Sequence, residues 1–273
     1  MRLLVLLFLL LTPFAAAEDS PDSAQVRREI SQGVRAYRQG QYAEAAVHFE
    51  KAVQLDPHSI NPRLYLATSY AAQASPGSNR PGGDALLRKA ENEYLKVLEL
   101  NPEEENALRS LANLAYERTT ALEDPAAKRE QLERASGWYE RLAEASPKDK
   151  GALYMIGVLA SSRCEPVLAA AREKSGMKPE SPGPIAASGE RDQARKLCGE
   201  ILDTGIAALE KAIAIDPDYD DAMAYMNLLL RDRANFAPTM EAWQSEIQAA
   251  GEWPAKASEA RKRRASAPRP SQR

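Results

Sequence analysis

The apolar positions of this chain recur at a fixed spacing. A small residue is followed four positions later by a large apolar residue, three positions after that by another apolar residue, and five further on by Pro. Intervals of four and three place the first three side chains on one face of a helix, and the Pro and the polar residue before it stop that helix. The four copies begin at Ala45, Ala90, Ala135 and Gly205 and end at Pro57, Pro102, Pro147 and Pro217.

This pattern resembles the second helix of the tetratricopeptide repeat (TPR), a helix-turn-helix unit. The resemblance covers about residues 26–264 and implies an all-α chain that forms a right-handed superhelix, or α-solenoid, of about five repeats. The run from Asp216 to Leu228 also resembles exported bacterial TPR proteins of unassigned role. The expected repeats are 26–59, 60–104, 105–149, 150–219 and a degenerate unit at 220–264.

Repeat register then assigns the packing residues. Gly33 and Ala45 are the small residues that let two helices approach, and Phe49 fills the junction between neighbouring pairs. The same register assigns packing to Ala90, Tyr94, Ala135, Tyr139, Gly157, Gly205 and Leu209. The later repeats exceed the standard length, so we expect lengthened hairpins with the added turns shared between both helices.

The fifth unit departs from the pattern because Pro254 occupies the position of its large residue. A Pro inside a helix removes a hydrogen bond, so we expect the last helix to kink or end there. Trp243 and Trp253 are interpreted as cover for the last face of the stack, because terminal repeats need capping. The alternative is that these tryptophans stack on a ligand.

The first seventeen residues have the pattern of a secretory signal. Arg2 precedes a nine-residue apolar stretch, Leu3 to Leu11, which is too short to span a bilayer. Ala15, Ala16 and Ala17 provide a small-residue cleavage site. We expect cleavage after residue 17 and export to the periplasm or the medium, with no transmembrane segment left; an uncleaved membrane anchor is the alternative.

Charge is distributed unevenly along the chain. The whole chain carries a net charge of −3, whereas residues 255–273 contain seven Lys or Arg and one Glu. Residues 18–254, the expected solenoid, are correspondingly acidic, which argues against nucleic-acid binding. The like-charge run in residues 255–273 predicts a disordered basic tail. The alternative is that this tail contacts anionic lipid or the acidic body of a second copy.

The two cysteines lie in the enlarged fourth repeat. Gly157 and Gly205 are expected to face each other, and Cys164 follows the first by seven residues while Cys198 precedes the second by seven. Seven residues are about two helical turns, so both thiols lie on the facing sides. In an oxidising compartment this arrangement predicts a disulfide; two buried free thiols are the alternative.

Known catalytic and metal-binding patterns are missing from the sequence. His48 and His58 are the only histidines, and neither their spacing nor their distance from a Cys matches a metal site. No nucleophile motif, dinucleotide Gly pattern or phosphate loop occurs. We therefore predict a protein that is not an enzyme and uses no cofactor or metal.

The resemblance implies a concave binding face made by the first helix of each repeat. Arg109, Asn113 and Tyr116 in repeat three partly match the clamp with which some TPR domains hold a peptide C-terminal carboxylate, but the match occurs in one repeat only. The expected partner-binding residues are Arg27, Tyr37, Arg38, Asn61, Asn106, Arg109, Asn113, Tyr116, Tyr154 and Arg231.

Together these features predict an exported scaffold that binds a peptide or protein in its groove, with a role in cell-envelope assembly. The alternative is a structural protein that acts through self-association or envelope association, using its open terminal face and basic tail. Residues alone identify neither the partner nor the oligomeric state.

Overall fold

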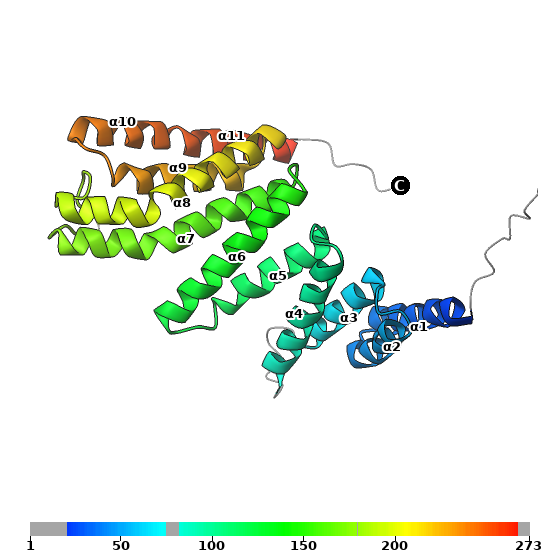
Figure 1. The fold of residues 1–273 in the computed structure, drawn as a ribbon. Helices are drawn as coiled ribbons and strands as arrows, with labels where there is room; N and C mark the ends of the chain where they lie inside the picture. Colours follow the sequence, from blue (N-terminus) through cyan, green and yellow to red (C-terminus); the bar gives the residue numbers. More distant parts are fainter. Residues whose placement is uncertain (1–20, 75–81, 179, 267–273) are drawn as a thin grey trace, which may run out of the picture. The chain divides into compact units, whose positions relative to one another are not determined.

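The structure is a computed structural model that describes residues 21–74, 82–178 and 180–266. The chain divides into two compact units, residues 1–90 and 91–273. The described residues form eleven α-helices joined by turns, with no strand among them (Figure 1). The expected signal segment, residues 1–17, lies outside the described residues.

The first unit is built from a helix hairpin and the helices that follow it. A tight turn at Gly40, where φ is +75°, reverses the chain between the first two helices. A Cβ atom on Gly33 would lie 2.6 Å from the Phe49 ring, so only glycine admits this ring between the helices. The helices are α1 (Pro21–Arg38), α2 (Tyr42–Leu55), α3 (Ile60–Gln73) and the start of α4 (Gly83–Leu100).

The second unit continues from the end of α4 as a row of helices, each packed on the next. The pair α7 and α8 is the longest, and α9 packs against both of its members. The helices are α5 (Glu105–Arg118), α6 (Pro125–Ala145), α7 (Lys150–Lys174), α8 (Ser188–Ile215), α9 (Asp220–Ala234), α10 (Met240–Gly251) and α11 (Trp253–Ser266).

The ends of the second helices agree with the repeat pattern. Helices α2, α6 and α8 stop at C-cap residues Asp56, Ser146 and Asp216, each followed by the repeat's Pro. Asp124 caps the start of α6 by accepting hydrogen bonds from the backbone N–H groups of Ala126 and Ala127. The expected packing residues are all buried: Gly33, Ala45, Phe49, Ala90, Tyr94, Ala135, Tyr139, Gly157, Gly205 and Leu209.

The prediction that added turns are shared between both helices was wrong for repeats two and three. Their first helices, α3 and α5, have 14 residues each, while α4 has 18 and α6 has 21. The extension therefore lies in the second helix and in the connecting segment. In repeat three, Thr119 and Thr120 explain this, since their hydroxyls donate to backbone carbonyls and end α5.

The fifth repeat has its second helix in two pieces. Helix α10 ends at Gly251, and Pro254 is the second residue of α11, where a missing N–H costs nothing. Both pieces pack along α9 and follow one another in Figure 1. The break at Pro254 was thus predicted, but the continuation of the same row beyond it was not.

The prediction of a disordered tail from residue 255 was wrong as far as residue 266. Helix α11 buries Ala257 and Ala260 against Met223, with Ile213 and Trp253 beside them. This packing covers the terminal face of the stack, which the sequence had suggested was open. The like charges of α11 do not prevent this packing, because acidic residues at and just before the start of α9 pair with them. Residues 267–273 lie outside the described part.

Two carboxylates anchor α11. The side chain of Asp220 is only 4% exposed and accepts hydrogen bonds from Arg261 and Arg264. Arg263 donates from Nε to Asp218 at 2.7 Å. Burial by itself would raise the pKa of Asp220, but the two arginines outweigh it and hold the pKa below its usual range. The basic run is therefore a structural element of the solenoid.

Candidate functional site

A group of half-buried tyrosines lies where the first helices of the second unit meet. The Tyr154 ring on α7 is 5.3 Å from the Tyr219 ring and 5.5 Å from the Tyr225 ring, between centroids. Tyr116 on α5 is close enough to be among the groups that raise the pKa of both Tyr154 and Tyr225. We call Tyr116, Tyr154, Tyr219 and Tyr225 the tyrosine cluster.

The phenols of Tyr154, Tyr219 and Tyr225 stay protonated at physiological pH. The pKa of Tyr154 is raised to about 12, mainly by burial and further by neighbouring tyrosines and Asp221. Burial likewise raises the pKa of Tyr219 and Tyr225. Neutral phenols combine an apolar ring with a hydroxyl that donates and accepts hydrogen bonds, which suits them to protein recognition.

Arg109 and Asn113, the candidate carboxylate clamp, are already engaged within the chain. Arg109 forms an ion pair with Asp149, whose side chain also caps the start of α7. Burial would raise the pKa of Asp149, but Arg109 and two backbone N–H groups outweigh it and lower the pKa. Asn113 accepts a hydrogen bond from the Tyr139 hydroxyl at 2.5 Å. These contacts make both residues positioning residues for α5, α6 and α7, and they argue against the clamp.

The other expected partner-binding residues differ in accessibility. Arg231 on α9 is exposed and lies beside Leu228, which is 41% exposed. Asn106 is exposed and donates to Glu104 at 2.9 Å. In the first unit, Tyr37 is half-buried with its ring 5.0 Å from that of Tyr42. The exposed members of the set in that unit are Arg27, Arg38 and Asn61.

Sequence reasoning missed Tyr219 and Tyr225. They occupy the last position of repeat four and the sixth position of repeat five, next to the positions assigned to the face. The available signal was the presence of two tyrosines in the run 218–228. Their contact with Tyr154 depends on how α9 packs against α7, which a repeat register alone does not give.

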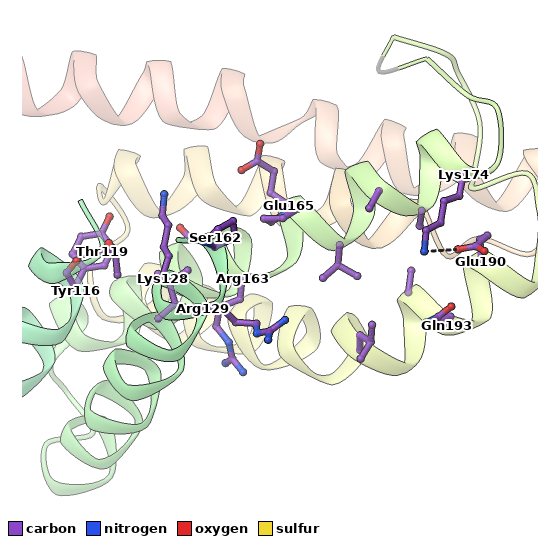
Figure 2. A pocket seen from close by; sticks show the side chains of 18 of the residues that line it. Tyr116, Thr119, Lys128, Arg129, Ser162, Arg163, Glu165, Lys174, Glu190 and Gln193 are labelled. Atoms are coloured by element: carbon purple, nitrogen blue, oxygen red, sulfur yellow. Dashed lines mark hydrogen bonds and ion pairs between the residues drawn. The ribbon is translucent and has the colours of Figure 1, made fainter. Parts of the chain in front are cut away.

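A pocket of about 630 Å³ lies beside the tyrosine cluster and shares Tyr116 with it. The end of α5, the start of α6, the second half of α7 and the first turns of α8 form its walls (Figure 2). It exists because α7 and α8 are longer than the preceding helix pair, so their walls extend past the turn between α5 and α6. Apolar wall residues are Pro125, Leu132, Pro166, Val167, Ala170, Ala171, Ala194 and Leu197; charged ones are Lys128, Arg129, Arg163, Glu165, Lys174 and Glu190.

The structure joins Cys164 on α7 and Cys198 on α8 in a disulfide, with their Cα atoms 5.6 Å apart. Both residues are buried, and α7 continues as a helix through Pro166. Pocket residues flank the bridge on both sides, with Arg163 before Cys164 and Leu197 before Cys198. The disulfide therefore ties together the two long walls of the pocket.

The described residues contain neither a metal-binding cluster nor a membrane-spanning helix. Within residues 21–74, 82–178 and 180–266, no group of three or more His, Cys, Asp or Glu side chains is placed to hold a metal ion. In the same ranges, no helix combines the length and the apolar character needed to cross a membrane.

One repeat of the chain matches a known family in sequence, and most of the chain resembles solved structures. Residues 30–59 match the family model of the tetratricopeptide repeat. No protein of curated function matches the chain.

Solved structures resemble a much larger part of the chain. A crystal structure of MamA is 16% identical with a TM-score of 0.56, covering 90% of this chain and 98% of that one. MamA from Desulfovibrio magneticus RS-1, residue 41 to the end, is 17% identical with a TM-score of 0.52, covering 87% and 96%. YrrB, described as a TPR protein with an unusual peptide-binding site, is 13% identical with a TM-score of 0.51, covering 90% and 100%. At these identities the likeness concerns the fold, an α-solenoid of helix pairs.

Proposed function

Because this chain is a tetratricopeptide repeat protein, we propose that it is an exported, non-enzymatic scaffold. We place its peptide or protein partner on the face formed by the first helix of each repeat. The fold itself supports a protein-interaction scaffold. The finer proposal places the partner against α5, α7 and α9 of the second unit, and it assigns the protein to cell-envelope assembly.

The observation that carries this proposal is the tyrosine cluster beside exposed residues of α9. Half-buried tyrosines keep an accessible edge and lose little side-chain freedom when a partner covers them. Leu228 adds an apolar side chain and Arg231 a cation with no ion pair among the described residues. Aromatic residues and Arg are the types that most often dominate binding energy at interfaces. The peptide-binding site named for YrrB supports the same use of this fold.

Export is proposed on sequence grounds. The signal pattern of residues 1–17 supports it, and a disulfide between Cys164 and Cys198 is suited to an oxidising compartment. Expression of the full chain in a bacterial host, followed by fractionation and N-terminal sequencing, tests this. A periplasmic product beginning at Glu18 supports export, and a cytoplasmic product that keeps Met1 opposes it.

Capture from envelope extract tests the binding face, with residues 18–273 as bait. One variant bait carries Leu228→Asp and Arg231→Glu. A matched control carries Ile215→Asp and Lys211→Glu on α8, a second helix; Ile215 has the same 41% exposure as Leu228. A partner retained by the control and lost by the first variant, and rebound by purified wild-type protein, supports the proposal. Equal capture by all three baits places binding elsewhere.

The alternative of self-association through an open terminal face has lost its main support. Helix α11 covers that face in the structure, and the basic run is paired with Asp218 and Asp220. These contacts favour the binding-scaffold function over self-association through that face.

A further inference from the structure

Three cations at one end of the 630 Å³ pocket have no acidic partner. Lys128 and Arg129 on α6 and Arg163 on α7 line that end, and none of them forms an ion pair with any described residue. Figure 2 places these three side chains together, whereas Lys174 pairs with Glu190 at the opposite end, 3.9 Å apart. In contrast, Arg109 and Arg118 on α5 and Arg134 on α6 do pair with carboxylates, and these pairs lie outside this end of the pocket.

The unpaired cations stand out because the surrounding chain is acidic. Residues 18–254 carry more acidic than basic side chains, yet the pocket wall holds four basic residues and two acidic ones. Of the two acidic residues, Glu190 is paired with Lys174, and Glu165 forms no ion pair with any described residue. Clustering like charges without a counter-charge is unfavourable, so the arrangement favours an external anion.

Three hydroxyl donors of the pocket are already occupied. The hydroxyls of Thr119, Thr120 and Ser162 donate to the backbone carbonyls of Tyr116, Glu117 and Val158. The cationic side chains, together with the Tyr116 hydroxyl and the Gln193 amide that also line the pocket, are therefore the donors left to bind an anion. Arginine is suited to this because its guanidinium group holds a carboxylate with two parallel hydrogen bonds.

Much of the remaining pocket wall is apolar. Leu132 and Ala194 are buried in its wall, and Leu197 on its rim is 54% exposed, the largest exposed fraction of any large apolar side chain described. An exposed Leu beside a concave apolar wall is typical of a surface that a partner's side chain covers. The ligand must therefore present an apolar group beside its negative charge.

We propose that this pocket binds an acidic segment of the partner protein, with carboxylates held by Arg129 and Arg163 and an aliphatic side chain packed on Leu132 and Leu197. The inference rests on the proposed function in that the partner is a protein, but it uses a different surface from Leu228 and Arg231. The disulfide between Cys164 and Cys198 keeps the α7 and α8 walls of the pocket in place.

Fluorescence anisotropy with defined peptides tests the proposal on the mature chain, residues 18–273. The probe is a short fluorescein-labelled peptide of glutamates with two leucines; its comparison peptide has Gln in place of every Glu. Wild-type protein should bind the acidic peptide and bind the Gln peptide at least roughly tenfold more weakly, because hydrogen bonds to charged groups are lost. Rising salt should weaken the first binding only.

Two double variants give the decisive comparison. Arg129→Gln with Arg163→Gln should weaken binding of the acidic peptide at least about tenfold. Lys148→Gln with Lys211→Gln removes the same charge from exposed sites outside the pocket and should change binding less than about twofold. Both variants should keep the wild-type far-UV circular dichroism spectrum, since the mutated side chains have no partner within the described chain.

Several outcomes would overturn the inference. Equal weakening by both double variants would show a diffuse charge effect, and no binding of the acidic peptide by folded wild-type protein would show an unused pocket. Binding to phosphatidylglycerol vesicles but not to the peptide, lost in the Arg129 and Arg163 variant, would make the ligand a lipid. If the α9 variant loses the captured partner while the pocket variant keeps it, the proposed function stands and this inference fails.

Discussion

Gly157 on α7 and Gly205 on α8 face each other so closely that a Cβ atom on Gly205 would lie 3.5 Å from the Cα atom of Gly157. The same added atom would lie 2.6 Å from the Cβ atom of Ala160, a separation that packed atoms do not tolerate. The two long helices of repeat four can therefore pack at this distance only while position 205 lacks a side chain.

Gly205→Ala is accordingly expected to lower the free energy of unfolding by about 1–3 kcal/mol through overpacking. Gly199→Ala in the same helix is the control, because its Cβ atom would meet only the flexible Arg195 side chain at 3.5 Å. That change should be neutral or stabilising by up to about 1 kcal/mol, since Ala favours helix. Urea denaturation of both variants measures the difference; equal stability would contradict the packing argument.

Arg261 and Arg264, which pair with Asp220, should contribute more to the free energy of unfolding than their neighbour Arg263. Replacing Arg261 and Arg264 by Gln leaves a buried carboxylate without its charged partners and should cost about 1–3 kcal/mol, reduced from the fully buried case because both arginines are more than half exposed. Arg263→Gln, which loses an exposed pair with Asp218, should cost less than about 1 kcal/mol. Because the pKa of Asp220 is lowered, its stabilisation is present above pH 4 and is lost as the pH falls through the folded-state pKa. The difference between variants should therefore shrink below pH 4.

Removal of α11 should expose an apolar surface at the end of the stack. A chain ending at Glu252 uncovers Met223 and Ile213, and we expect it to self-associate at micromolar concentration. A chain ending at Ser266 keeps the helix and should sediment as the full-length protein does. Sedimentation velocity at several concentrations compares them. If the shorter chain behaves like the longer one, α11 is not needed to cap the stack.

The pH dependence of stability should carry a contribution from Asp232 on α9. Its pKa is raised to about 7, mainly by burial and also by the nearby Glu165, while Arg231 and a hydrogen bond with Ser161 oppose the rise. One of its carboxylate oxygens is enclosed without a hydrogen-bond partner in the described structure. A raised carboxyl pKa means that the folded state binds the proton more tightly. The contribution is thus fully present below about pH 4 and is lost as the pH rises through 7.

Asp232→Asn should therefore stabilise the protein at pH 8, by the order of 1–3 kcal/mol, and by much less at pH 5. Denaturation at the two pH values measures this. Asp192→Asn on the exposed face of α8 is the control and should change the free energy of unfolding by less than about 0.5 kcal/mol at either pH. An equal effect of Asp232→Asn at both values would rule out titration of this carboxyl group.

The bridge between Cys164 and Cys198 predicts no free thiol in the denatured, unreduced protein. Replacing both cysteines by Ser should lower the free energy of unfolding by about 2–4 kcal/mol, and reductant should then have no further effect. If the pocket walls depend on the bridge, the Ser variant should also bind the acidic peptide more weakly. A titration that finds two thiols would refute the disulfide.

Local sequence determined the helix pairs and their packing residues. The recurring small, large and Pro positions fix which side of each helix is buried, so the burial of Gly33, Ala45 and Phe49 and the seven-residue offsets of Cys164 and Cys198 could be read from spacing alone. Helix stops at Asp56, Ser146 and Asp216 followed for the same reason, since capping and Pro act within a single turn. These are features in which each residue interacts with neighbours at known intervals.

Tertiary structure decided what lies between helices of different repeats. The pairing of Arg109 with Asp149, the approach of Tyr225 to Tyr154 and the pocket at Arg129 and Arg163 join residues whose separation follows no repeat interval. Tertiary contacts also decided the structure of the basic run. Residues 261–264 belong to a helix that pairs with Asp220 and packs against Met223. Periodicity specifies one face of one helix, whereas charge pairing and pocket shape depend on how separate helices meet.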